Sequence, residues 1–141
     1  HTSTKNPVGL SEALTGMEKA EDCVYSTQMD HLHLMFCGKY PPNPVELLSS
    51  PHFRKLLENA RDVYDYVIVD TPPLGRVIDA AVIAPLCDGT LLVMANNTIR
   101  CKDAQNVVDQ LNKSGGKILG VVRNNVKRES RIYGKYKYYG K

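Results

Sequence analysis

The stretch YVIVDTPPLG, residues 66–75, decides the fold. Its first four residues form an apolar run without polar alternation, which predicts a strand buried on both faces in the centre of a parallel sheet. The run ends at Asp70, and Pro72 and Pro73 follow at once. This stretch therefore predicts an aspartate at the carboxyl end of a central strand, the edge where open α/β sheets bind their ligands.

Strand and helix signals alternate after this stretch. Helical spacing is found in VIDAAVIAPLC (77–87) and in KDAQNVVDQLNKSGG (102–116), which ends at glycines. Buried strands are predicted for TLLVMA (90–95) and KILGVVRNN (117–125). This alternation implies right-handed crossovers and an α/β fold with a doubly wound, mostly parallel sheet.

The residues before this stretch carry shorter signals. GLSEALTG (9–16) predicts a helical turn, and LHLMFCG (32–38) predicts a buried strand closed by Gly38. Asn43 before Pro44, and Ser50 before Pro51, predict the starts of two consecutive helices. We expect the second helix to present one apolar face, made of Phe53, Leu56, Leu57 and Ala60.

Composition predicts one compact domain followed by a basic tail. The chain has 141 residues, of which 43% are hydrophobic and 23% charged. Its net charge is +3, but residues 127–141 alone carry +5, which leaves −2 for residues 1–126. We therefore divide the chain into a domain, 1–126, and a flexible tail, 127–141.

Four of the eight tyrosines lie in the tail, at Tyr133, Tyr136, Tyr138 and Tyr139. Two glycines interrupt any helical or strand pattern there, so these rings are not expected to be core. A displayed phenol invites modification, whereas aromatic rings among basic residues could stack on single-stranded nucleic acid. The tail sequence alone leaves both interpretations open.

Other candidate sites give weaker signals. The four cysteines form no C-x-x-C pair, and His31 and His33 lack a third ligand, so neither a zinc site nor a disulfide framework is indicated. Asp79 is expected to cap its helix rather than to do chemistry. Asp70 fits the Walker B arrangement, in which a carboxylate holds Mg²⁺ against nucleotide phosphates, or it simply ends a strand.

Several motifs together resemble the bacterial tyrosine kinases, the cytoplasmic kinases of capsule and exopolysaccharide export. The resemblance is carried by VIVDTPPLG (67–75), by residues 78–99, by ILGVVRNN (118–125), by GLSEALTG (9–16), by GKYPPNPVELL (38–48) and by the tyrosine-rich tail. These motifs cover nearly the whole chain in the family's order. The resemblance implies a P-loop ATPase-like fold of the MinD and ParA type and an ATP-dependent protein-tyrosine kinase that regulates polysaccharide synthesis.

The resemblance also assigns roles to residues. It makes Asp70 a catalytic Mg²⁺ ligand beside ATP, and it places Asn124 against the adenine, although Asn124 could instead turn the chain. Arg123 departs from the family pattern, in which a nonpolar residue precedes that asparagine. The tail tyrosines become autophosphorylation sites, phosphorylated in trans by a neighbouring subunit, at Tyr133, Tyr136, Tyr138 and Tyr139.

The same resemblance implies partners and a location. It predicts a homo-oligomer that phosphorylates protein tyrosines and binds a membrane-bound polysaccharide co-polymerase. We accordingly expect a cytoplasmic protein at the inner face of the plasma membrane, and no nucleic acid.

Two family motifs are missing from these 141 residues. Nothing fits the phosphate-binding loop G-x-x-x-x-G-K-[ST] or an apolar strand that ends D-x-D-x-R. We therefore expect the chain to begin after both motifs, to form an incomplete P-loop domain and to be inactive alone. The alternative is a non-kinase ATPase or scaffold whose tail binds nucleic acid or an acidic partner.

Overall fold

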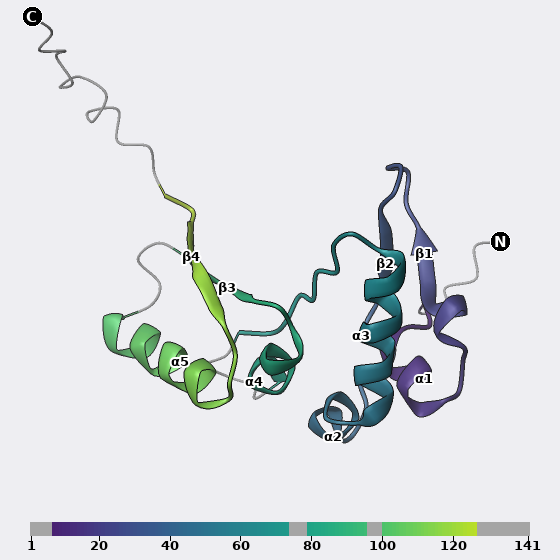
Figure 1. Cartoon of the computed structure of the whole chain (residues 1–141), viewed down its shortest axis with the longest axis horizontal. Coiled ribbons are helices and arrows are strands. Elements are labelled where there is room, and N and C mark those ends of the chain that lie inside the picture. Colours follow the sequence, from purple (N-terminus) through teal and green to yellow (C-terminus); the bar gives the residue numbers. More distant parts are fainter. Residues whose placement is uncertain (1–6, 74–78, 96–99, 127–141) are drawn as a thin grey trace, which may run out of the picture.

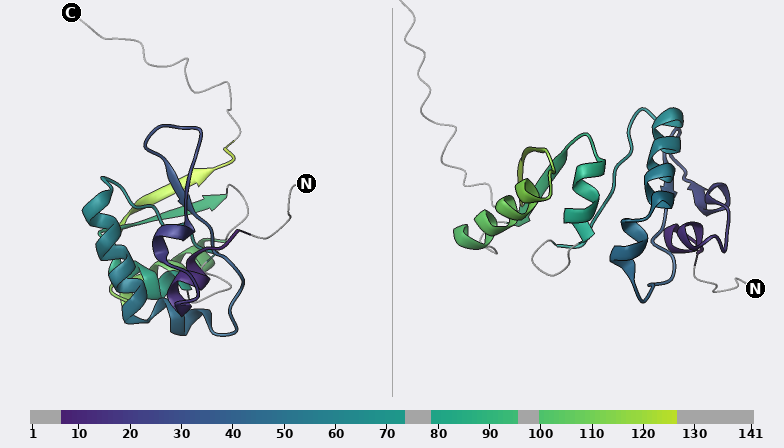
Figure 2. Two further views of the ribbon diagram at one scale, coloured as in Figure 1. Left: turned by 90° about the vertical axis from the view of Figure 1, so that its right-hand side faces the viewer. Right: turned by 60° about the horizontal axis from the view of Figure 1, so that its bottom comes forward.

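The computed structural model describes residues 7–73, 79–95 and 100–126. Figure 1 shows a hairpin and its neighbouring helices at one end of the molecule, a strand–helix–strand unit at the other, and α4 (Asp79–Ile83) between them. A second orientation keeps this order (Figure 2). The first end contains α1 (Leu10–Thr15), β1 (Val24–Ser26), β2 (His33–Met35), α2 (Pro44–Leu48) and α3 (Pro51–Val63). The rest comprises α4 (Asp79–Ile83), β3 (Thr90–Ala95), α5 (Cys101–Lys113) and β4 (Ile118–Asn124), with short 3₁₀ turns at Ala20–Cys23 and Ala84–Leu86.

The hairpin pairs β1 with β2 in antiparallel register, with Tyr25 opposite Leu34. The prediction of a buried strand over 32–38 is wrong in its burial, because Leu34 and Phe36 are exposed. A ribbon of two strands has no further strand that could cover these side chains. The Tyr25 ring covers Phe36 only in part, with 5.3 Å between the two ring centroids. Gly38 follows the ribbon with φ of +76°, a conformation that favours glycine.

The two helices predicted after the hairpin are confirmed. The Ser50 hydroxyl accepts a hydrogen bond from the Phe53 amide at 3.3 Å and so caps α3. Asn43 lies directly before α2 as predicted, but its side chain donates to the Glu46 carboxylate instead of capping the backbone. Both helices therefore begin where the proline and capping signals indicate.

The first apolar cluster joins this end of the molecule to α4. Leu14 of α1, Phe53 of α3 and Ile83 of α4 are buried together. The apolar side of α3 contributes Leu56 and Leu57 at its edge, as the helical spacing predicts. Half-buried residues of the surrounding segments complete the cluster: Leu10, Leu47, Leu48, Val69, Leu86 and Cys87.

The second apolar cluster forms between the parallel pair β3–β4 and α5. Ala84, Val107 and Leu111 are buried, and Leu92 of β3 and Ile118 of β4 pack against them. The two strands are parallel and joined through α5, which confirms the predicted strand–helix–strand unit. Helix α5 therefore covers one face of this sheet.

The strand predicted at Tyr66–Val69 is not formed. Tyr66 and Ile68 are 88% and 91% exposed, and only Val69 packs into the first cluster. A strand is stabilised by hydrogen bonds to its neighbours, and in the described part of the chain no segment pairs with these residues. The sheet itself is also uncovered in places, since several of its large apolar side chains are exposed, namely Leu91, Val93, Leu119, Val121 and Val122.

Gly116 is required by close packing against the second apolar cluster. A Cβ at this position would lie 2.7 Å from the Cβ of Ala84, which is buried and cannot move aside as a long side chain could. Gly115, directly before it, has φ of +84° and ends α5 as the glycine signal predicts. The approach of the α5–β4 turn to Ala84 thus depends on the absence of a side chain at Gly116.

We predict that Gly116→Ala lowers the free energy of unfolding by about 1–3 kcal/mol, the usual cost of overpacking. Gly120→Ala in β4 is the matched control, because a Cβ there meets no atom within 4 Å. Alanine in a strand is favoured over glycine, so this control should leave stability unchanged or raise it slightly. Urea denaturation measures both variants, and an equal loss in the two would contradict the packing argument.

Candidate functional site

Asp70 directly follows Val69, the residue of this segment that packs into the first apolar cluster. Val69 holds the backbone against the first apolar cluster, whereas Asp70 itself is exposed. Among the described residues, no ion pair or hydrogen bond engages its carboxylate. Asp70 therefore offers its oxygens outward, and a carboxylate is a ligand type that Mg²⁺ prefers.

Asn124 is the last residue of β4 and is paired with Ala95 of β3. Both lie at the carboxyl ends of parallel strands, the edge at which α/β sheets bind ligands. The Asn124 side-chain oxygen accepts a hydrogen bond from the Asn125 amide at 2.8 Å, and Asn125 has φ of +55°. In this structure Asn124 thus turns the chain, and its contact with adenine stays a prediction.

Asp79 differs from the sequence-based expectation. It is the first residue of α4 and is only 7% exposed. Its Oδ1 atom is buried without a hydrogen-bond partner among the described residues, so a capping role finds no support there. The sequence gives no signal for this burial, because Asp79 precedes an ordinary apolar helix.

The remaining predicted site residues lie outside the described part of the chain. They are the tail tyrosines, Tyr133, Tyr136, Tyr138 and Tyr139. The proposed division between 1–126 and 127–141 coincides with the end of the described residues and stays a prediction.

Glu12, in the GLSE motif, connects the start of α1 to the segment that follows the hairpin, a connection that we call the Glu12 lock. Its two carboxylate oxygens accept hydrogen bonds from the amides of Gly9 at 2.8 Å and Lys39 at 3.1 Å. A side chain at Gly38 would collide with this carboxylate, so the glycine leaves room for it. The sequence analysis missed this lock, although a glutamate three residues after a helix-start glycine is a capping-box signal.

The hydrogen bonds from the Lys39 and Gly9 amides hold the pKa of Glu12 below its ordinary value of 4.5. A carboxylate whose pKa is lower in the folded than in the unfolded state stabilises the fold. This stabilisation is complete at a pH above the unfolded-state pKa and is lost as the pH falls through the folded-state pKa. We predict that Glu12→Gln is less stable than the parent at neutral pH. The difference should shrink as the pH falls below about 4.5, which urea midpoints across pH 3–7 will measure.

Glu58→Gln is the control for this experiment, because Glu58 is exposed on α3 and receives no such bonds. The Glu58 variant should follow the parent at every pH. A Glu12 variant with the parent's neutral stability would refute the lock.

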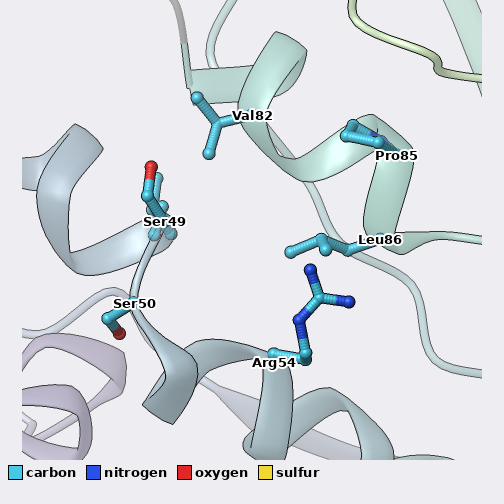
Figure 3. Close-up of a pocket in the computed structure, with 7 residues that line it drawn as sticks. Ser49, Ser50, Arg54, Val82, Pro85 and Leu86 are labelled. Carbon is cyan, nitrogen blue, oxygen red and sulfur yellow. The ribbon is translucent and has the colours of Figure 1, made fainter.

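A cavity of about 250 Å³ lies between the α2–α3 corner and the α4 region (Figure 3). Arg54 reaches into it, and Val82, Pro85 and Leu86 line the opposite wall. The hydroxyls of Ser49 and Ser50 at its edge already serve local backbone bonds. None of the predicted site residues lines this cavity, so it offers no support for a catalytic role.

Two general features of the described residues bear on the site. No three His, Cys, Asp or Glu side chains in residues 7–73, 79–95 and 100–126 gather closely enough to hold a metal ion. None of the helices described is long and apolar enough to cross a membrane.

Comparison with known structures defines the class of protein. The chain superposes on the kinase domain of the Escherichia coli tyrosine kinase ETK with a TM-score of 0.84 and 35% identity, covering 95% of this chain and 52% of that one. The VpsO kinase domain gives a TM-score of 0.79 with 36% identity, over 86% of this chain and 60% of that one. The predicted α/β class is confirmed, and the fold is that of part of a tyrosine kinase domain.

Sequence relatives agree with this class. Tyrosine-protein kinase CpsD from Streptococcus agalactiae is 39% identical over 133 residues, which are 94% of this chain and 58% of that protein. Tyrosine-protein kinase YwqD from Bacillus subtilis is 35% identical over 96% of this chain and 56% of its own length. No protein-family model matches the chain.

These comparisons confirm the resemblance predicted from the sequence: the chain is a relative of the bacterial tyrosine kinases. It spans a little over half the length of CpsD and YwqD. They also favour the kinase interpretation over the alternative of a non-kinase ATPase or scaffold.

Proposed function

We propose that the chain is the C-terminal part of a bacterial protein-tyrosine kinase domain, residues 1–126, followed by a substrate tail, residues 127–141. The whole protein would transfer the terminal phosphoryl group of ATP to tyrosine hydroxyls. The observation that carries this proposal is the exposed carboxylate of Asp70, which pairs with none of the described residues, in a chain whose relatives and structural neighbours are tyrosine kinases.

Asp70 would hold Mg²⁺ beside the nucleotide phosphates. Bound Mg·ATP supplies the phosphoryl group and neutralises the charge that develops during transfer. Asp70 suits this task because Val69 fixes the backbone directly before it, while its own carboxylate stays open. Asn124 would contact the adenine once its side chain exchanges its bond to Asn125 for one to the base.

The unpaired segment Tyr66–Val69 supports a further part of this proposal. Apolar side chains of this segment are exposed, and the chain spans 58% of CpsD. We therefore expect the remaining part of the whole protein to cover these side chains. Covering them would add strands to the sheet and bring phosphate-binding groups near Asp70. The 141 residues alone would then be inactive.

The tail and the partners follow from the same proposal. Tyr133, Tyr136, Tyr138 and Tyr139 would be phosphorylated in trans within a homo-oligomer. Each phosphate adds about −1.5 to −2 charges at neutral pH, so about three of them offset the tail's +5. A membrane-bound polysaccharide co-polymerase would hold the kinase at the inner face of the plasma membrane and link it to capsule or exopolysaccharide synthesis.

We predict that Asp70→Asn in the whole protein lowers the rate of tyrosine autophosphorylation by about 10²–10³, the usual cost of losing one group that stabilises developing charge. The fold should persist, because the Asp70 side chain contacts no described partner. Asp65→Asn is the matched control, since Asp65 is an exposed aspartate five residues upstream.

Phosphotyrosine is measured by mass spectrometry after incubation with Mg·ATP. In the parent and the Asp65 variant, the phosphate should be found on peptides from residues 131–141. Normal labelling of the Asp70 variant would exclude this residue from the site, and labelling confined to other tyrosines would exclude the tail as the substrate.

A further inference from the structure

Tyr40 displays its phenol to solvent in the segment between β2 and α2. It is 83% exposed and lies in neither a helix nor a strand. Among the described residues, no group forms a hydrogen bond with its hydroxyl. Tyr40 can therefore offer its oxygen to a second molecule without breaking a contact of the described fold.

The other tyrosines in the described part of the chain are less available. The Tyr25 hydroxyl donates to a backbone carbonyl at 3.1 Å, and the Tyr64 ring packs edge-on against His33, with 5.6 Å between the ring centroids. Tyr66 is exposed, but it belongs to the segment that the rest of the whole protein is proposed to cover. Of these four tyrosines, Tyr40 alone combines a free hydroxyl with a position outside that segment.

The backbone is held on both sides of Tyr40. The Lys39 amide donates to Oε1 of Glu12 at 3.1 Å, so the Glu12 lock ends one residue before Tyr40. Pro41 and Pro42 follow, and a proline fixes its own φ and favours an extended backbone at the residue before it. A side chain that is already held in an extended segment loses less conformational entropy when it enters an active site.

The sequence around Tyr40 also occurs in the tail. The tripeptide Gly-Lys-Tyr is found at residues 38–40 and again at residues 134–136. The second copy ends at Tyr136, one of the proposed acceptors. In both copies a lysine directly precedes the tyrosine, and a positive charge there favours approach to a site that holds nucleotide phosphates. The folded domain thus carries the same local sequence as the proposed substrate tail.

We propose that Tyr40 is a further phosphorylation site, on the folded domain instead of the tail, an inference that rests on the proposed kinase function. The Tyr40 phenol oxygen would form a bond to the γ-phosphorus of ATP held by a neighbouring copy of the whole protein. The bond between that phosphorus and its bridging oxygen breaks, and ADP leaves. The phenol proton passes to water, so tyrosine and ATP yield phosphotyrosine, ADP and a proton.

Tryptic digestion separates Tyr40 from every other tyrosine. Cleavage at the lysine before it and at Arg54 releases residues 40–54, in which Tyr40 is the only tyrosine, and Tyr25 lies in a different peptide. The whole protein is incubated with Mg·ATP and digested, and fragmentation spectra locate each phosphate. We expect phosphate on Tyr40 and on the tail tyrosines, and none on Tyr25.

Tyr40→Phe removes only the hydroxyl. This variant should lose all phosphate from residues 40–54, while its tail labelling and its urea midpoint stay those of the parent. Tyr25→Phe is the matched control, because it removes a hydroxyl that donates a hydrogen bond within the fold. It should lower the urea midpoint and leave the labelling of Tyr40 unchanged.

The outcomes distinguish this inference from the proposed function. A whole protein that labels its tail but not Tyr40 would overturn the inference and leave the kinase function standing. Equal labelling of Tyr25 and Tyr40 would overturn it as well, because phosphorylation would then not depend on exposure. Phosphate that stays on residues 40–54 in Tyr40→Phe would assign it to a serine and reject the site. A whole protein that labels no tyrosine would refute the proposed function, and this inference with it.

Discussion

The structure depends on the packing of two consecutive residues, Ile83 and Ala84. Ile83 is buried with Leu14 and Phe53, whereas Ala84 is buried with Val107 and Leu111. The last residue of α4 therefore belongs to one apolar cluster and the first residue of the following 3₁₀ turn to the other, so that the two join the hairpin end of the molecule to the parallel strands. Burial of apolar side chains is the main favourable contribution to folding, so the packing at this junction holds the two ends of the molecule together.

The position of the candidate site follows from this junction. Val69 and Ile83 of α4 both pack in the first cluster. The chain between them carries Asp70 and Asp79, one exposed and one buried. The packing of Val69 holds the backbone directly before Asp70, which suits a residue proposed to hold a metal ion.

Local signals predicted much of this fold. Pro44, Ser50 and Pro51 act on the backbone next to them, so the starts of α2 and α3 could be predicted without knowledge of the rest of the molecule. The parallel pair β3–β4 was predictable because its apolar runs flank a strongly periodic helix. The burial of Leu34, Tyr66 and Ile68 was predicted wrongly, because these residues are exposed. An apolar run indicates which side chains a strand would bury, but it does not show whether neighbouring segments are present to bury them.

The candidate site was predicted only in part for the same reason. Asp70 was found from its place after an apolar run, since that pattern is local. The burial of Asp79 has no signal in its own segment, and the lock of Glu12 joins residues 27 apart. The family motif identified Asn124 as a candidate site residue. It could not predict that the Asn124 side chain accepts a hydrogen bond from the next amide, because that bond depends on the local turn.

The central claim is our proposal that Tyr66–Val69 forms a strand only beside neighbouring strands that the rest of a kinase domain supplies. Amide hydrogen exchange of these four residues tests it most directly, compared between the 141-residue chain and the whole protein. The account predicts rapid exchange in the 141-residue chain and strong protection in the whole protein, with the amides of β3 and β4 protected in both. Rapid exchange of Tyr66–Val69 in the whole protein as well would contradict the claim.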